Sequence, residues 1–122
     1  MKEEFEMKEI KVIFEFEQNF KAVIHPFLAE ILVRNLLSNA LKYTNDGGVV
    51  KIISSKDDFA VFNTGSPFQF DPGMIFKRFF YAGNSSVSQG IGLSLVKKIA
   101  ESFKLNVTYS YVDEFHKFTL KP

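Results

Sequence analysis

The sequence predicts a two-layer α/β (α+β) sandwich, in which a mixed and mostly antiparallel sheet is covered on one face by helices. The expected elements follow the order strand, strand, helix, strand, strand, loop, helix, strand, strand, without the βαβ alternation of a parallel sheet. The length of 122 residues suits a single core, and 46% of the residues are hydrophobic, including 15 Phe. Because no repeat or linker-like segment interrupts the pattern, we expect residues 1–122 to form one domain.

The first half of the chain is expected to place a long helix between strands. Residues 1–8 are highly charged, and we expect them to be loosely held. Residues 8–17 and 21–25 carry the alternating, β-branched and aromatic side chains typical of strands. Pro26 suits the first turn of a helix, which should run to about residue 44, before an Asn-Asp-Gly-Gly turn.

The second half is expected to consist of two hairpins around a second helix. The predicted strands are residues 49–54, 59–63, 106–112 and 115–120. Between the hairpins, the aromatic-rich residues 68–81 predict an irregular segment with a helical turn, and the small, polar residues 82–89 predict a mobile loop. Residues 92–103 predict an amphipathic helix, because one face carries Leu93, Val96, Ile99 and Ala100.

Composition and charge exclude several classes of protein. A net charge of +1 argues against a protein held on nucleic acid mainly through phosphate contacts. The absence of cysteine excludes disulfides and thiolate metal sites, and His25 and His116 lie too far apart in sequence to suggest a histidine-rich zinc site. No apolar run could span a bilayer, and the N-terminus does not resemble a signal peptide. We therefore expect a cytoplasmic domain without direct membrane contact, which also fits one part of a membrane-anchored sensor.

The segment NLLSNALKYT, residues 35–44, is the most informative stretch of the sequence. It places Asn35, Asn39, Lys42 and Tyr43 at i, i+4, i+7 and i+8, which is one stripe of a helix. Asn is a mediocre helix former, and a merely solvated face would more naturally carry Glu, Lys or Gln. The stripe therefore indicates a binding face with oxygen ligands, a cation and an aromatic ring. From this segment alone, an ordinary polar helix face explains the pattern equally well.

Two further segments carry candidate binding groups. Gly90 and Gly92 precede the second helix, where backbone N–H groups and the helix N-terminus favour an anion. Taken alone, a flexible loop joined to a helix is the better explanation. Asn63, Thr64 and Gly65 end a predicted strand, which is a common place for a ligand-reading side chain. Without other observations, an ordinary turn is favoured there.

Taken together and in this order, these segments resemble the ATP-binding catalytic domain of bacterial sensor histidine kinases, in the superfamily that includes gyrase. The resemblance covers about residues 9–122 and implies the Bergerat-type ATP-binding fold, with residues 66–89 as a lid over the nucleotide. The segments that carry it are NLLSNALKYT (the Asn box), FNTGSPF (the first glycine box), IFKRFF (the Phe box) and QGIGLSLVKKIAE (the second glycine box). It implies a protein-histidine kinase that uses ATP and Mg²⁺.

The resemblance assigns a role to each candidate residue. Asn39 would bind Mg²⁺ through its amide oxygen, and Asn35 would lie near the waters of the metal and the phosphates. Lys42 would place a cation on the phosphate chain, and the resemblance assigns Asn35 and Lys42 to catalysis. Tyr43 would pack against the adenine, and Asn63 would accept a hydrogen bond from its amino group. The remaining nucleotide-binding positions are Gly65, Phe68, Gly90, Ile91, Gly92 and Leu93.

The resemblance also separates two kinds of chemistry. Superfamily members that activate water or a hydroxyl carry a Glu one turn before the metal-binding Asn, whereas this chain has Asn35, which cannot take a proton. A histidine kinase needs no such base, because its nucleophile is a histidine on another domain. Neither His25 nor His116 lies in the expected H-E-x-x-x-P stretch. The resemblance therefore implies an upstream dimerisation domain that carries the phosphoacceptor, and a response regulator as a further partner.

Several positions depart from the family pattern. Asn63 replaces an Asp and loses its charge, so we expect ATP to bind more weakly by about 1–2 kcal/mol. Pro67 and Tyr81 stand where relatives have Gly and Arg, and His116 stands where Thr is common. Two interpretations remain open, an active kinase domain and a degenerate module of the same fold that only docks to a partner. A superfamily ATPase or serine kinase is disfavoured by Asn35.

Overall fold

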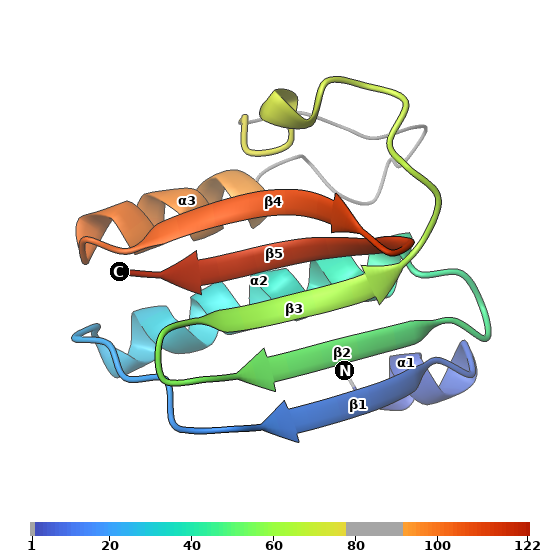
Figure 1. Ribbon diagram of the computed structural model, residues 1–122, viewed down its shortest axis with the longest axis horizontal. Coiled ribbons are helices and arrows are strands. Elements are labelled where there is room, and N and C mark those ends of the chain that lie inside the picture. Colours follow the sequence, from blue (N-terminus) through green and yellow to red (C-terminus); the bar gives the residue numbers. More distant parts are fainter. Residues whose placement is uncertain (1, 78–91) are drawn as a thin grey trace.

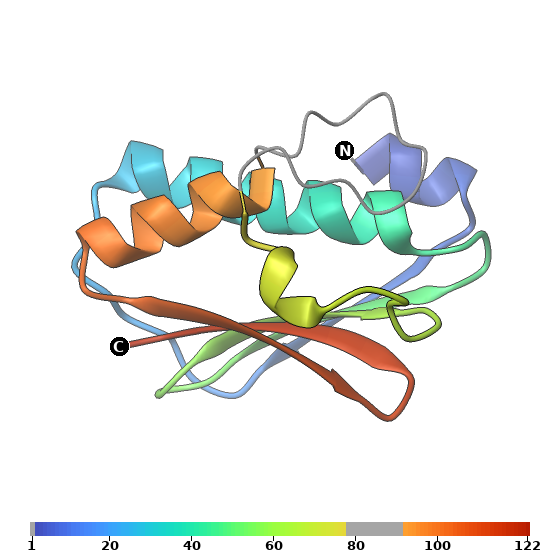
Figure 2. The same ribbon diagram turned by 90° about the horizontal axis from the view of Figure 1, so that it is seen from above.

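The computed structural model describes residues 2–77 and 92–122, and it consists of a sheet layer and a helix layer (Figures 1 and 2). The sheet has the strand order β1-β2-β3-β5-β4. Its strands are β1 (Lys11–Phe16), β2 (Val49–Ser54), β3 (Phe59–Thr64), β4 (Asn106–Val112) and β5 (Phe115–Lys121). The helices are α1 (Lys2–Met7), α2 (Pro26–Tyr43) and α3 (Gly92–Ser102), with a 3₁₀ turn, η1 (Pro72–Met74). The predicted two-layer fold is confirmed.

One pair of strands in the sheet is parallel. The pairs β2/β3, β3/β5 and β4/β5 are antiparallel, whereas β1 and β2 run in the same direction. Because α2 connects these two strands, β1, α2 and β2 form a βαβ unit, which the expected order of elements had excluded. The sheet is mixed and mostly antiparallel, as predicted.

The prediction of a strand at residues 21–25 is wrong. These residues form no strand, and Val23 is 93% exposed. Among the described residues, β1 is the outermost strand of the sheet and pairs only with β2, and residues 21–25 lead into α2 without pairing with its free edge. The helix then begins as predicted, with Pro26 in its first turn, and the Nδ1 atom of His25 accepts a hydrogen bond of 3.1 Å from the backbone N–H of Phe27.

The expectation that the N-terminal segment is loosely held is also wrong. Residues 2–7 form α1, whose Phe5 is buried in the core. Just after this helix, Lys8 Nζ donates hydrogen bonds to the carbonyl oxygens of Leu41 at 2.8 Å and of Thr44 at 2.7 Å. These carbonyls belong to the end of α2, where a cation is favoured by the helix dipole. The segment therefore anchors to the C-terminal end of the long helix.

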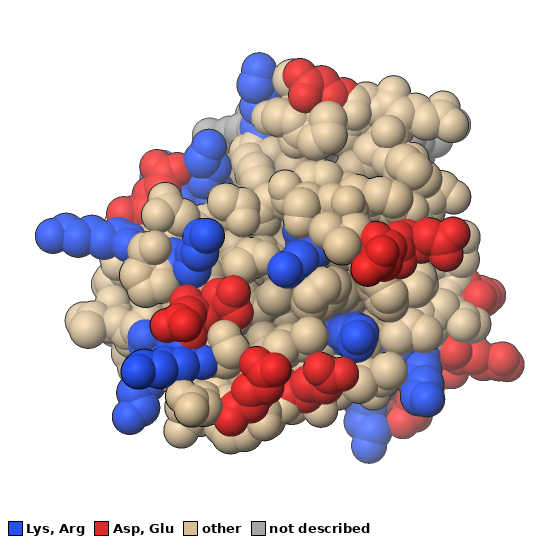
Figure 3. Space-filling model, viewed as in Figure 1, with Lys and Arg blue, Asp and Glu red and all other residues tan. Residues whose placement is uncertain are grey.

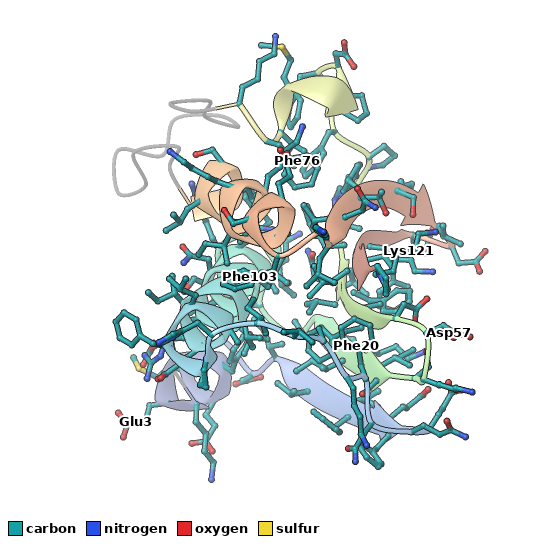
Figure 4. The ribbon with its side chains drawn as sticks, turned by 90° about the vertical axis from the view of Figure 1, so that its left-hand side faces the viewer. Glu3, Phe20, Asp57, Phe76, Phe103 and Lys121 are labelled. Carbon is teal, nitrogen blue, oxygen red and sulfur yellow. The ribbon has the colours of Figure 1, made fainter. Side chains whose placement is uncertain are left out.

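Side chains of α2 and α3 fill the space between the two layers. The buried side chains of α2 are Leu32, Leu36 and Ala40, each 1% exposed, at a spacing of four residues. Those of α3 are Val96, Ile99 and Ala100, which match the predicted apolar face. Figure 4 looks along both layers and shows Phe20 and Phe76 reaching into the space between them, where Phe76 lies edge-on to Phe118 of β5.

The helices leave much of β1 uncovered. Val12, Phe14 and Phe16 are paired in register with Val50, Ile52 and Ser54 and therefore lie on the helix-covered face of the sheet, yet Phe14 is 62% exposed. Two hollows, of about 420 and 300 Å³, separate β1 from α2. The opposite face of the sheet carries both acidic and basic side chains (Figure 3), in keeping with a net charge of +1.

The burial of Phe5 gives a prediction about α1. We expect Phe5→Ala to lower the free energy of unfolding by about 2–4 kcal/mol, because it removes a ring from the core. Met7 lies on the same helix and is 84% exposed, so Met7→Ala should change the free energy by less than about 0.5 kcal/mol. Urea unfolding of both variants measures the difference, and equal effects would show that α1 is not docked in solution.

Candidate functional site

The flank of α2 that carries Asn35 faces the beginning of α3. The Nδ2 atom of Asn35 donates a hydrogen bond of 2.8 Å to the carbonyl oxygen of Ile31, one turn earlier. Its other amide atom, Oδ1, is directed at Gly92, since a β-carbon added to this glycine would lie 3.1 Å from that oxygen. Glycine thus permits a close approach between the two helices. The structure brings together two segments that the sequence singled out separately.

Asn39, Lys42 and Tyr43 follow Asn35 along α2, and all are half-exposed. Lys42 Nζ lies 5.0 Å from the centroid of the Tyr43 ring, within the range of a cation–π contact. The exposed flank therefore offers two amides, one ammonium group and one aromatic ring. Within the part of the chain that the structure describes, no three His, Cys, Asp or Glu side chains gather in a group that could hold a metal.

A row of polar side chains crosses the helix-covered face of the sheet near the end of α2. Asn63 of β3 pairs with His116 of β5, which pairs with Tyr111 of β4. Asn63 is only 1% exposed, and its Nδ2 atom lies 3.4 Å from the carbonyl oxygen of Thr64. The next row on this face is apolar at the equivalent β3 and β5 positions, Val61 and Phe118. Asn63, His116 and Tyr111 thus gather polar groups at the end of this face that lies beside the end of α2.

Phe68 is the centre of an aromatic cluster beside this row. Its ring stacks on His116 with centroids 4.1 Å apart and on Phe70 at 4.6 Å. The edge of Tyr43 approaches the same ring at 6.0 Å, so the cluster connects the end of α2 to the sheet. Phe68 was predicted to touch the nucleotide, and in the structure its ring packs against these neighbours.

His116 is held as a neutral ring. The Nε2 atom lies 2.9 Å from the carbonyl oxygen of Ser66, which can only accept a hydrogen bond, so Nε2 carries the proton. Nδ1 then accepts a hydrogen bond of 2.6 Å from the hydroxyl of Tyr109. Burial lowers the pKa of His116 below its usual range, partly offset by the bond to Ser66. Burial, and then the neighbouring Tyr111, raise the pKa of Tyr109 to about 12.

The predicted site residues thus fall into two groups. Asn35, Asn39 and Lys42 share one flank of α2 with Gly92 opposite, whereas Asn63, Gly65 and Phe68 lie at the sheet end, next to Tyr43. Leu93 packs against the core. Gly90, Ile91 and residues 78–89 of the predicted lid lie outside the described residues.

Sequence reasoning missed two residues of this region, Tyr109 and Tyr111. They occur at alternate positions of the predicted strand 106–112, which was the available signal that both face the same side as His116. Their significance depends on the pairing of β4 with β5. This pairing places the Tyr109 hydroxyl beside Nδ1 of His116 and the Tyr111 ring 5.1 Å from the His116 ring.

Comparison with known proteins identifies the family. The profile described as histidine kinase-, DNA gyrase B-, and HSP90-like ATPase matches residues 25–122. The chain belongs to this family. The resemblance predicted from the Asn and glycine boxes is confirmed at this level.

Relatives of this domain include sensor proteins of bacteria. QseC of Escherichia coli O157:H7 is 33% identical over an alignment of 105 residues that covers 80% of this chain and 22% of QseC. The sensor histidine kinase HprS of Escherichia coli K12 is 32% identical over an alignment of 124 residues that covers 96% of this chain and 27% of HprS. The chain therefore spans about a quarter of the length of these relatives.

Solved structures share the fold. The catalytic domain of the histidine kinase ThkA, in a nucleotide-free form, matches 98% of this chain and 82% of that domain with a TM-score of 0.82 at 22% identity. Another structure of ThkA, with a TM-score of 0.78, is a complex with the response regulator TrrA. In this chain, no helix within residues 2–77 or 92–122 combines the length and hydrophobicity needed to cross a bilayer.

The buried neutral state of His116 predicts a pH-dependent stability. Since the pKa of His116 is lower in the folded than in the unfolded state, its neutral form contributes stability above the unfolded pKa, and this contribution is lost as the pH falls. Between about pH 7.5 and 5.5, the free energy of unfolding should fall less steeply in His116→Gln than in the parent protein. Urea unfolding at several pH values measures this slope. A His116→Gln slope equal to that of the parent would contradict the prediction.

Proposed function

We propose that this domain binds ATP and Mg²⁺ and presents the γ-phosphoryl group to a histidine on another domain of a sensor histidine kinase. The observation that carries the proposal is the approach of Asn35 on α2 to Gly92 at the start of α3. This approach places an amide-rich helix flank opposite a helix N-terminus, where phosphate is favoured. The alternative, a degenerate docking module, has no comparable observation in its favour.

The side chains on α2 suit a magnesium-bound triphosphate. Mg²⁺ prefers oxygen ligands and keeps several waters, so one amide oxygen and the phosphates are a sufficient set. Because the Nδ2 atom of Asn35 is bonded to Ile31, its oxygen is the amide atom directed at the start of α3. In this proposal Asn39 holds the metal, Asn35 orders its waters and Lys42 contacts the phosphate chain. The metal, when bound, neutralises charge on the phosphates.

The other end of the nucleotide would lie at the sheet end of α2. Tyr43 and Phe68 supply aromatic surface, Asn63 accepts a hydrogen bond from the adenine amino group, and Gly65 permits a close backbone approach. The residues 90–93 would supply backbone N–H groups to the phosphates. Because Asn63 is 1% exposed, binding of the base requires a rearrangement of the side chains that cover it.

Asn35 also supports the choice of histidine kinase over hydrolase. An amide cannot act as a general base on water, and the described part of the α2 flank presents no acid in its place. Catalysis would rest on positioning and charge neutralisation, with the γ-phosphoryl group passing to an imidazole nitrogen as ADP leaves. The partners would be an upstream dimerisation domain and a response regulator, in keeping with the complex of ThkA with TrrA. The domain would be cytoplasmic and attached to a membrane-anchored sensor.

Calorimetric titration of the domain with ATP in the presence and absence of Mg²⁺ tests the proposal. We expect Mg²⁺ to strengthen binding, and Asn39→Ala to weaken this metal-dependent affinity by at least about tenfold, since even outer-shell partners of metals have effects of that size. Ser38→Ala is the matched control, because Ser38 is the preceding residue of α2 and is exposed.

The absence of ATP binding at millimolar concentration would instead identify a docking module. If ATP does bind, γ-labelled ATP and a protein that includes the histidine-bearing helices would test phosphoryl transfer. A product that retains label on this domain alone would argue against the proposed acceptor.

A further inference from the structure

The loop that follows β3 is bound to the hairpin of β4 and β5 by three hydrogen bonds. The N–H group of Gly65 donates to the carbonyl oxygen of Glu114 at 3.2 Å. The carbonyl oxygen of Gly65 accepts from the Tyr111 hydroxyl at 2.7 Å, and that of Ser66 accepts from His116 Nε2 at 2.9 Å. We call these three hairpin residues, Tyr111, Glu114 and His116, the hairpin clamp. In Figure 1 the end of β3 lies beside the turn between β4 and β5.

Glycine at position 65 lets the loop lie close against the His116 ring. A β-carbon there would lie 3.0 Å from both Cδ2 and Nε2 of the His116 ring, and 3.7 Å from the carbonyl oxygen of Tyr43. The loop is therefore confined between the last residue of α2 and the sheet. Its position depends directly on the His116 ring, whose tautomer is fixed by the carbonyl oxygen of Ser66.

The turn that presents Glu114 adopts an unusual backbone conformation. Both central residues, Asp113 and Glu114, have positive φ angles, of 51° and 67°. This conformation suits the tight hairpin but is adopted more readily by Asn or Gly. The hydrogen bond from Gly65 lies at this turn, so the hairpin end and the loop are coupled through the backbone.

We propose that the hairpin clamp sets the position of residues 63–68 and thereby the preference of the site for adenine, with Tyr111 and His116 as positioning residues. The inference rests on the proposed function, because it assumes that residues 63–68 contact the base. Tyr111 and His116 lie in the same row of the sheet as Asn63, in which His116 pairs directly with Asn63 and Tyr111 pairs with His116. The clamp acts on the base and leaves the phosphate end of the site unchanged.

The test compares the dissociation constants of ATP and GTP, both with Mg²⁺, in matched variants. Tyr111→Phe removes only the hydroxyl that binds Gly65. His116→Phe keeps a ring to stack on Phe68 but removes the donor to Ser66. Thr108→Val removes a hydroxyl from the exposed face of the same strand and serves as the control. Thermal unfolding without nucleotide confirms that each variant is folded.

We expect the parent protein to bind ATP more tightly than GTP. Tyr111→Phe and His116→Phe should weaken ATP binding about five- to tenfold and change GTP binding little, so that the ATP preference decreases. Thr108→Val should retain the preference. An unchanged ratio of the two constants in both variants would overturn the proposal, as would an equal loss for both nucleotides or a parent protein that does not distinguish them. A parent protein that binds neither nucleotide would instead contradict the proposed function itself.

Discussion

The burial of Leu32, Leu36 and Ala40 against the sheet is the constraint on which the candidate site depends. These side chains fix the rotation of α2 about its axis, because each successive residue turns the helix by about 100°. The neighbouring stripe of Asn35, Asn39 and Lys42 then has to lie beside the core and towards α3, where Gly92 meets the Asn35 amide. A small rotation of α2 would bury these amides or direct them away from α3.

The sheet is also divided into an apolar part and a polar part. Its helix-covered face is apolar along most of its length and becomes polar in the row that contains Asn63, His116 and Tyr111. This change occurs where α2 ends, beside the loop after β3, whose Phe68 and Phe70 pack against the core. The aromatic cluster around Phe68 closes this end of the interior and connects it to Tyr43. The helix α2 thus carries a buried apolar face and, beside it, a half-exposed polar flank.

Much of the fold follows from local sequence signals. The helix from Pro26 and the strands on either side of residues 55–58 were predictable, because proline, turn residues and alternating hydrophobicity act over a few residues. The parallel pairing of β1 with β2 was not, since it joins strands separated by the whole of α2. The α1 helix was missed because its single buried side chain, Phe5, gives no periodic pattern.

The candidate site was predictable to a similar degree. The stripe on α2 could be read from helical spacing, whereas its meeting with Gly92 depends on how two helices pack. The engagement of Gly65 by Tyr111, Glu114 and His116 depends on strand pairing across β3, β5 and β4. No single segment of the sequence contains that information.

A crystal structure of the domain with ATP and Mg²⁺ tests the central claim most directly. The account predicts a magnesium ion about 2.1 Å from the amide oxygen of Asn39, with the phosphates between α2 and the first turn of α3. A nucleotide bound elsewhere on the domain, or a metal with Asn39 turned away from it, would contradict the account.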